Sequence, residues 1–274
     1  SGYTGLSAAL ILARAGRSVA VFEKDRLGEG ASTRNGGIAS GGIRMRFSRM
    51  IEMFGEAGAE IIYPNPGFPI YQSAIEFTGA TAVAMPLHED TGFSFKADEV
   101  LDLISPNTRL IILNSPANPT GGVTPRGEIE RLVNGLSAHP DVYIMSDEIY
   151  ARMLYDGREH VSLLEFEAIR DRVILLDGWS KTYAMTGWRM GYGVWPKTLI
   201  EGATRLAINC HSCVNAASQF AGIAALEGPQ SDVDDMVQAF DQRRGIIVEA
   251  LNQIPGITCA GSGGAFYAFA NTSG

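Results

Sequence analysis

Residues 180–189 read Ser180-Lys181-Thr182-Tyr183-Ala184-Met185-Thr186-Gly187-Trp188-Arg189 and follow a short apolar run at 173–176. The run predicts a buried strand, and open α/β sheets bind their ligands at the edge where parallel strands end. Aromatic residues surround the lysine along the chain, at positions 179, 183 and 188. An amine in a partly apolar pocket loses hydration of its charged form and becomes a nucleophile towards a carbonyl carbon. The stretch therefore predicts Schiff-base chemistry at Lys181, against the simpler alternative of an exposed lysine at a strand end.

The composition is typical of a globular protein with a large core. The chain has 274 residues, of which 46% are hydrophobic and 19% charged, so one large domain or two smaller ones would fit. The formal net charge is -8 and the basic residues are dispersed, which disfavours binding to a nucleic-acid backbone. The apolar run at 6–13 is too short to span a membrane. We therefore expect a cytoplasmic protein with no nucleic-acid or membrane partner.

Three cysteines are too few for a disulfide framework in a chain of this length. Cys210 and Cys213 have the Cys-x-x-Cys spacing that can hold zinc or exchange disulfides. A tetrahedral zinc site needs further ligands, and the third cysteine and the histidines at 88, 139 and 160 are scattered. Chance spacing is the better interpretation, and we expect no metal.

From about residue 45, short apolar segments alternate with amphipathic ones. The pattern predicts strands near 60–63, 82–86, 109–113, 142–146, 172–176 and 190–194, and helices at 69–78, 125–137, 197–208, 215–227 and 232–252. Such an alternation specifies a mostly parallel, doubly wound α/β sheet. The last helix is long enough to bridge two lobes, and two further strands at 257–259 and 265–269 predict the start of a smaller domain.

Two further motifs follow strands of this sheet. Asn118 lies in a Pro/Gly turn at 114–122, either as a hydrogen-bond donor or simply as part of the loop. Asp147-Glu148-Ile149-Tyr150 comes directly after the strand at 142–146. A carboxylate at that depth needs a cation, which is either a protonated pyridine nitrogen or a structural salt-bridge partner. Because these groups, Lys181 and Arg189 would all meet at the ligand-binding edge, a shared functional site is favoured over separate structural roles.

These motifs stand in the order Asn118-Pro-Thr-Gly-Gly, Asp147-Glu-Ile-Tyr150, Ser180-Lys181 and Met185-Thr-Gly-Trp-Arg189. Their order and residues closely resemble those of the class I/II aminotransferases with the aspartate-aminotransferase fold, from about residue 45 to the end. The resemblance implies the large domain of fold type I, pyridoxal 5'-phosphate as cofactor, and a homodimer. It also implies transfer of an amino group from an L-amino acid to a 2-oxo acid.

The resemblance assigns a role to each matching residue. It implies that Lys181 forms a Schiff base with pyridoxal phosphate and later shuttles a proton, while Asp147 keeps the ring nitrogen protonated. Asn118 and Tyr150 would hydrogen-bond the 3′ oxygen of the ring. Arg189 would bind the phosphate as a bidentate fork, with Ser180 as a second phosphate ligand. Phe68 would stack on the cofactor ring, or would pack as an ordinary core residue.

The departures from the family pattern predict truncation at both ends. The family has a longer segment ahead of this region, and it has most of a small domain, including an arginine for the substrate carboxylate, after Gly264-Ala265-Phe266-Tyr267. We therefore expect cofactor binding to persist and substrate binding to be impaired. Gly41-Gly42 matches either the phosphate-binding glycine pair of the family or the tail of the preceding segment.

Residues 1 to about 40 carry a signature of their own. Gly2-Tyr3-Thr4-Gly5, a helical run, a strand ending in Glu23 and the glycine-rich segment at 30–37 resemble the FAD-binding amino terminus of oxidases of the D-amino-acid-oxidase type. We divide the chain into a partial dinucleotide-binding βαβ segment (1–44), a large domain (45–231), an interdomain helix (232–255) and the start of a truncated small domain (256–274). Three alternatives stay open: another pyridoxal-phosphate reaction (lyase, decarboxylase or synthase), an FAD-dependent amine oxidase, and an inactive composite of two fragments.

Overall fold

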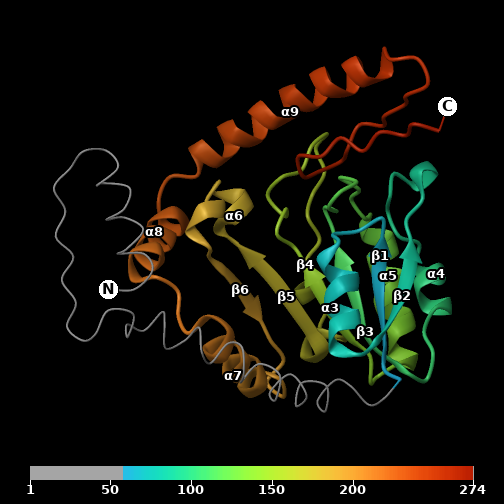
Figure 1. Ribbon diagram of the computed structural model, residues 1–274, viewed down its shortest axis with the longest axis vertical. Helices are drawn as coiled ribbons and strands as arrows, with labels where there is room; N and C mark the ends of the chain where they lie inside the picture. The colour runs from blue at the N-terminus through green and yellow to red at the C-terminus, as the bar shows by residue number, and fades with distance from the viewer. Residues whose placement is uncertain (1–57, 274) are drawn as a thin grey trace.

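The computed structural model describes residues 58–273, and these residues form one six-stranded sheet with helices on both faces (Figure 1). The strand order is β2-β1-β3-β4-β5-β6. β1 to β5 are parallel, and β6 is antiparallel to β5. The strands are β1 (Glu60–Asn65), β2 (Thr81–Pro86), β3 (Thr108–Asn114), β4 (Tyr143–Asp147), β5 (Val173–Gly178) and β6 (Gly191–Val194). The predicted mostly parallel, doubly wound sheet is therefore confirmed.

Alternate residues of the central strands enter two separate cores. Ile62 of β1 and Ile111 of β3 face one side, where they pack with Val100 of α4 (Ala97–Asp102) and Leu132 of α5 (Arg126–Gly135). Their neighbours Ile61 and Ile112 face the other side, against α3 (Ile70–Thr78). A strand buried on both faces needs a continuous apolar run, which is why the sequence of these strands does not alternate.

The helical periodicity of the apolar residues correctly predicted most of the helices. The predicted helices correspond to α3, α5, α7 (Ile200–His211), α8 (Ala216–Glu227) and α9 (Ser231–Asn252). The structure adds α4 and α6 (Trp179–Thr182), which are too short to show a full helical period. It also contains single 3-10 turns at η1 (Glu89–Thr91), η2 (Leu136–Ala138), η3 (Leu163–Glu165), η4 (Arg170–Arg172) and η5 (Thr186–Trp188).

β6 runs against the direction of the other strands. After β5 the chain passes through α6 and η5 and returns along β5, with Gly178 paired with Gly191. Arg189 therefore precedes an antiparallel strand, and its position at the carboxyl edge of β5 follows from this reversal. A side chain at Gly178 would place a Cβ 2.8 Å from the Cα of Gly191, so the close approach of the two strands requires glycine there.

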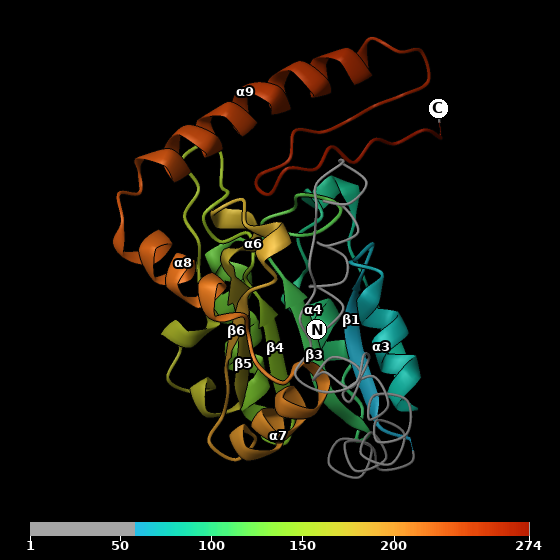
Figure 2. The ribbon, with the colours of Figure 1, turned by 60° about the vertical axis from the view of Figure 1, so that its left-hand side comes forward.

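The carboxyl-terminal residues do not form the two strands predicted at 257–259 and 265–269. They make isolated bridges instead, between Leu154 and Gly264 and between Thr258 and Asn271. A ladder needs several consecutive backbone pairs, and neither segment has a neighbour along its whole length. The segment runs back between α9 and the carboxyl ends of the parallel strands, as both views show (Figures 1 and 2). This course carries residues 264–267 to the edge of the sheet where the candidate site lies.

Candidate functional site

A cavity of about 320 Å³ lies at the carboxyl edge of the sheet. The segments that follow β1, β3, β4 and β5 line it, so residues far apart in the sequence meet there. All seven residues proposed from the sequence line this one cavity: Phe68, Asn118, Asp147, Tyr150, Ser180, Lys181 and Arg189. Six others line it that sequence reasoning did not propose: Tyr71, Asn114, Ile149, Leu176, Asp177 and Thr186.

Asp147 ends β4 with its carboxylate at the cavity wall. The Tyr71 hydroxyl donates a hydrogen bond to this carboxylate at 2.6 Å, and the backbone N–H of Ile149 donates another at 3.3 Å. Burial raises the pKa of Asp147 above its usual range, and the two hydrogen bonds oppose the shift. The charges of Asp177 and Glu148 raise this pKa further. The described residues thus leave Asp147 without a cationic partner, and a positively charged ligand group would supply one.

Glu148, next in the chain, points into a separate polar network. Its carboxylate accepts hydrogen bonds from the hydroxyls of Ser146 (2.9 Å) and Ser162 (3.1 Å) and from the backbone N–H of Leu163 (3.2 Å). Its other oxygen lies 2.6 Å from Nε2 of His160. This network ties the end of β4 to the chain at 160–163, so it fixes the backbone from which Asp147 projects.

Asn114 holds the Asn118 loop at the cavity. Its side-chain amide donates to the backbone carbonyl of Asp147 at 3.0 Å and accepts from the backbone N–H of Asn118 at 2.8 Å. One side chain therefore bridges the end of β4 and the loop after β3. The sequence predicted the loop and Asn118, but it carried no signal that Asn114 sets the position of both.

Lys181 lies on α6, one turn beyond the end of β5. Its ammonium nitrogen is 5.7 Å from the centre of the Tyr150 ring and 5.2 Å from the centre of the Phe266 ring. Tyr150 is 2% exposed, and its hydroxyl lies 2.5 Å from that of Tyr267. The ring contacts of the lysine amine thus come from Tyr150 and Phe266, not from the aromatic residues at 179, 183 and 188 that adjoin it in the sequence.

Arg189, Ser180 and Phe68 complete the cavity wall. Arg189 has φ 55° and ψ 51°, and among the described residues its guanidinium donates a hydrogen bond only to the carbonyl of Thr186. No ion pair neutralises Arg189 within residues 58–273, so its charge is available to an anion. Phe68 is 41% exposed and meets the Tyr71 ring edge-on at 5.7 Å. The alternative of Phe68 as an ordinary core residue is therefore wrong.

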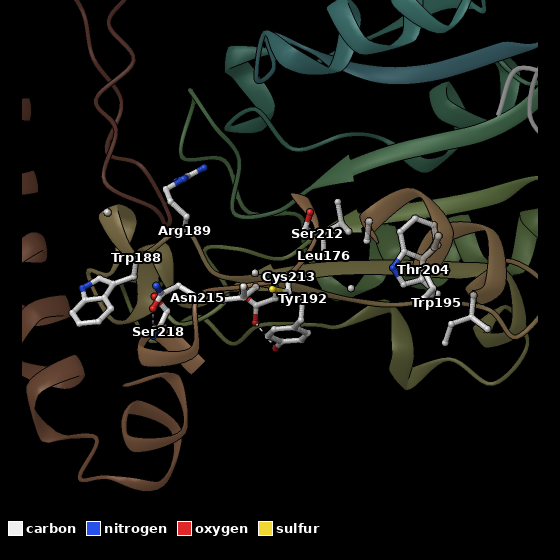
Figure 3. A pocket seen from close by; sticks show the side chains of 18 of the residues that line it. Leu176, Trp188, Arg189, Tyr192, Trp195, Thr204, Ser212, Cys213, Asn215 and Ser218 are labelled. Carbon is white, nitrogen blue, oxygen red and sulfur yellow. Dashed lines mark hydrogen bonds between the residues drawn. The ribbon is translucent and has the colours of Figure 1, made fainter. Parts of the chain in front are cut away.

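A second carboxylate, Asp177, stands between this cavity and a larger groove. It accepts hydrogen bonds from the backbone N–H of Gly178 (2.6 Å) and from the Tyr192 hydroxyl (2.8 Å), and burial raises its pKa. The groove has a volume of about 1420 Å³ and runs over β6 towards α7 and α8 (Figure 3). Leu176, Asp177 and Arg189 line both spaces, so the two are contiguous.

Several sequence expectations concern metals, membranes or the amino terminus. Cys210 and Cys213 are exposed and Cys259 is buried, and no three His, Cys, Asp or Glu side chains in the described part of the chain could together hold a metal ion. None of the helices between residues 58 and 273 is both long and apolar enough to cross a membrane. The FAD-type segment at 1–44 and Gly41-Gly42 lie outside the described residues.

Comparison with known proteins gives two family matches. The model of the family "Aminotransferase class I and II" matches residues 39–274, and the model of the family "FAD dependent oxidoreductase" matches residues 1–66. The aspartate aminotransferase of Geobacillus stearothermophilus is 37% identical over 231 residues, which are 84% of this chain and 58% of that protein. The chain thus spans little more than half the length of this relative.

Solved structures show the same likeness. The aspartate aminotransferase from Rhizobium meliloti superimposes with a TM-score of 0.76 at 26% identity, covering 99% of this chain and 79% of that one. An aromatic aminotransferase from Pyrococcus horikoshii gives a TM-score of 0.76 at 32% identity, covering 82% and 61%. The family model covers most of the chain, and these structures share its fold. The chain therefore belongs to the class I and II aminotransferase family.

Proposed function

We propose that this chain binds pyridoxal 5'-phosphate through Lys181 and transfers an amino group from an L-amino acid to a 2-oxo acid. The family to which it belongs uses this cofactor. The observation that carries the proposal is the meeting of Lys181, Asp147 and Arg189 on the wall of one cavity. An amine, a partly buried carboxylate and a guanidinium without an ion-pair partner in the described residues differ in chemistry, and pyridoxal phosphate has a complementary group for each.

The donor set of the cavity fits the cofactor. The partly buried carboxylate of Asp147 suits a protonated pyridine nitrogen, and Asn118 and Tyr150 are neutral donors for an oxygen on the ring. Arg189 and Ser180 suit a phosphate. The volume of about 320 Å³ is at the lower end of the range of small-molecule sites. The residues present therefore match the cofactor in charge and in size.

When bound, pyridoxal phosphate supplies an aldehyde and a ring that accepts electrons. Lys181 would contribute its amine as the nucleophile and would then carry a proton to and from the α-carbon of the substrate. Asp147 would hold the proton on the ring nitrogen, and Tyr71 would orient the Asp147 carboxylate. Phe68 would cover a face of the ring and limit its contact with water.

Borohydride reduction tests the proposed anchor. Purified protein would be incubated with pyridoxal phosphate, reduced, digested and analysed by mass spectrometry, in parallel with Lys181→Ala. We expect the added mass on Lys181 in the wild type and none at the matched peptide of the variant. The same adduct in both proteins, attached at another lysine, would refute the assignment of Lys181.

A second assay separates amino transfer from other reactions on this fold, because fold and cofactor do not choose the reaction. The protein would be given L-aspartate and 2-oxoglutarate, and glutamate formation would be followed. Release of ammonia or carbon dioxide without glutamate would favour a lyase or a decarboxylase instead. An inactive composite chain would bind the cofactor weakly and show none of these products.

The match of residues 1–66 to the FAD dependent oxidoreductase model favours a second candidate, a flavin-dependent amine oxidase. It predicts a bound yellow flavin and oxygen-dependent release of peroxide from an amine. Because these readouts differ from the borohydride adduct on Lys181, both candidates can be tested on one preparation.

We also propose a homodimer and a cytoplasmic location, together with the domain boundaries given above. Two exposed thiols support a reducing compartment. The exposed course of α9, in which only Val233 is buried, supports its assignment as an interdomain helix. Sedimentation of the purified chain over a range of concentrations tests the dimer.

A further inference from the structure

Tyr267 lies directly behind Tyr150 and outside the candidate site. Tyr150 lines the cavity that holds Lys181 and Asp147, whereas Tyr267 lines a separate space of about 310 Å³ beneath α9. The two hydroxyl oxygens are 2.5 Å apart. The hydrogen bond to Tyr150 therefore connects Tyr267 to the site.

The position of Tyr267 is set by the packing of its segment. The backbone N–H of Ala265 donates a hydrogen bond to the backbone carbonyl of Met153 at 2.9 Å, and the Tyr155 hydroxyl donates one to the carbonyl of Ala265. The rings of Tyr150 and Tyr267 meet edge-on, with centres 5.7 Å apart. Ala265 is fully buried, so the short contact between the two hydroxyls rests on a well-packed support.

Each phenol has a single proton, so only one of the two hydroxyls can donate in the bond between them. If Tyr150 donates to Tyr267, no proton of Tyr150 is left for the cavity. If Tyr267 donates, the Tyr150 proton can point into the cavity, and the bond it makes there is strengthened by the bond behind it. Burial raises the pKa of Tyr150 above its usual range, and the charge of Asp147 adds to the shift, so Tyr150 keeps its proton.

We propose that Tyr267 is a positioning residue that donates to the Tyr150 hydroxyl and thereby directs the Tyr150 proton to the ring oxygen of the bound cofactor. This inference rests on the proposed function. The titratable groups near the Tyr150 hydroxyl are Tyr267, Asp147, Tyr71 and Lys181. Of these, Tyr267 alone hydrogen-bonds to Tyr150 among the described residues and does not line the cavity.

The experiment is a double-mutant cycle on the visible absorbance of the Lys181–pyridoxal-phosphate adduct, titrated with pH. A donor to the ring oxygen stabilises the deprotonated adduct and so lowers its pKa. Tyr150→Phe should raise this pKa by about 1 pH unit or more, as expected for loss of a hydrogen bond to a charged oxygen. Tyr267→Phe should raise it by about 0.3 pH unit, because only the strengthening of that bond is lost. Tyr267→Phe added to Tyr150→Phe should have no effect.

Tyr155→Phe is the matched control, because it removes a hydroxyl that holds the same segment but does not touch Tyr150. We expect it to leave the adduct pKa unchanged. Near-UV circular dichroism would confirm that each variant is folded, and the comparison within the Tyr150→Phe background keeps the test valid if Tyr267→Phe alone is unstable.

Three results would overturn the inference. An unchanged pKa in Tyr267→Phe would show that Tyr267 has no influence, and a lowered pKa would show that Tyr150 donates to Tyr267. Equal shifts with and without the Tyr150 hydroxyl would show that Tyr267 acts by another route. If the wild type forms no adduct at Lys181, the proposed function fails together with the inference, whereas a normal wild type with any of the three results refutes the inference alone.

Discussion

Asp147 is partly buried and has no cationic partner among the described residues, and this predicts a conflict between stability and function. Its folded pKa is raised, so its contribution to stability is greatest below the unfolded pKa and is lost as pH rises through the folded pKa. Near neutral pH the ionised side chain therefore destabilises the cofactor-free protein. We predict that Asp147→Asn increases the free energy of unfolding near pH 7, by the order of 1 kcal/mol, and loses cofactor-dependent activity. Urea unfolding near pH 7 and near pH 4 measures the effect, which should shrink at the lower pH.

Asp156 provides the control of opposite sign. Its hydrogen bond with Arg244 lowers its pKa, so its contribution to stability is present above the unfolded pKa and is lost as pH falls through the folded pKa. Asp156→Asn should therefore destabilise the protein near neutral pH, and the loss should fade in acid. If Asp147→Asn behaves like Asp156→Asn, then a cation pairs with Asp147 in the folded protein, which would contradict the prediction.

A second prediction at the residue scale concerns Tyr71. Its hydroxyl donates to Asp147, so Tyr71→Phe removes a hydrogen bond to a charged acceptor and should cost about 1.5–3 kcal/mol of unfolding free energy. Tyr63→Phe is the matched control, because the Tyr63 hydroxyl donates to the neutral side chain of Gln72 at 3.1 Å. That change should cost about 0.5–1.5 kcal/mol. Chemical denaturation of both variants near pH 8 checks the difference, and equal losses would contradict the charged state of Asp147.

At the scale of elements, the strands and longer helices followed from the sequence because each has a local signature. An apolar run of four to six residues indicates a buried strand, and a period of 3.6 indicates a helix facing one core. The sequence could not show that β6 is antiparallel, because direction depends on where the chain goes after α6. The expected strands at 257–259 and 265–269 were wrong for a related reason, since a run of apolar residues predicts a strand only where a partner strand is available.

The site residues that were predicted also have a local signature in the sequence, whereas those that were missed depend on distant partners. Asn118, Asp147 and Lys181 each follow a strand directly, so their position in the sequence places them at the edge of the sheet. Tyr71 and Tyr267 act through partners 76 and 117 residues away, and no local pattern indicates such a partner. Nothing in the local sequence indicates that the ring of Phe266 lies beside the amine of Lys181.

A prediction at this scale concerns the contact between the Asn118 loop and the carboxyl-terminal segment. The carbonyl of Gly121 accepts hydrogen bonds from the backbone N–H groups of Gly263 and Gly264, both at 3.0 Å. Gly121 has φ +68°, and a Cβ there would lie 2.3 Å from the Cβ of Ser262. Gly121→Ala should therefore destabilise the protein by at least about 2 kcal/mol, from strain and overpacking together. Gly127→Ala, whose Cβ would meet nothing within 4 Å, should be neutral or mildly stabilising. Urea unfolding that ranks the two variants equally would refute the contact.

For the whole molecule, the cavity is the place where otherwise separate parts of the chain meet. Segments after β1, β3, β4 and β5 line it, and residues 264–267 lie against Tyr150 at its rim. A ligand held there connects these parts, and because it binds the folded state it raises stability by mass action. At a concentration 100 times its dissociation constant the gain is about 2.7 kcal/mol. For a chain of this size that corresponds to a rise in melting temperature of roughly 5–10 °C.

The last prediction uses this linkage to separate the contributions of the lysine and the phosphate site. Pyridoxal phosphate should raise the melting temperature of the wild type strongly, and that of Lys181→Ala and Arg189→Gln less, because each variant loses one attachment. Pyridoxal, which lacks the phosphate, should stabilise the wild type and Arg189→Gln to the same small extent, since neither then uses the guanidinium. Differential scanning fluorimetry of the three proteins with both ligands measures all six values. If pyridoxal phosphate stabilises Lys181→Ala as much as the wild type, binding does not depend on the lysine; if pyridoxal distinguishes wild type from Arg189→Gln, then Arg189 contacts something other than the phosphate.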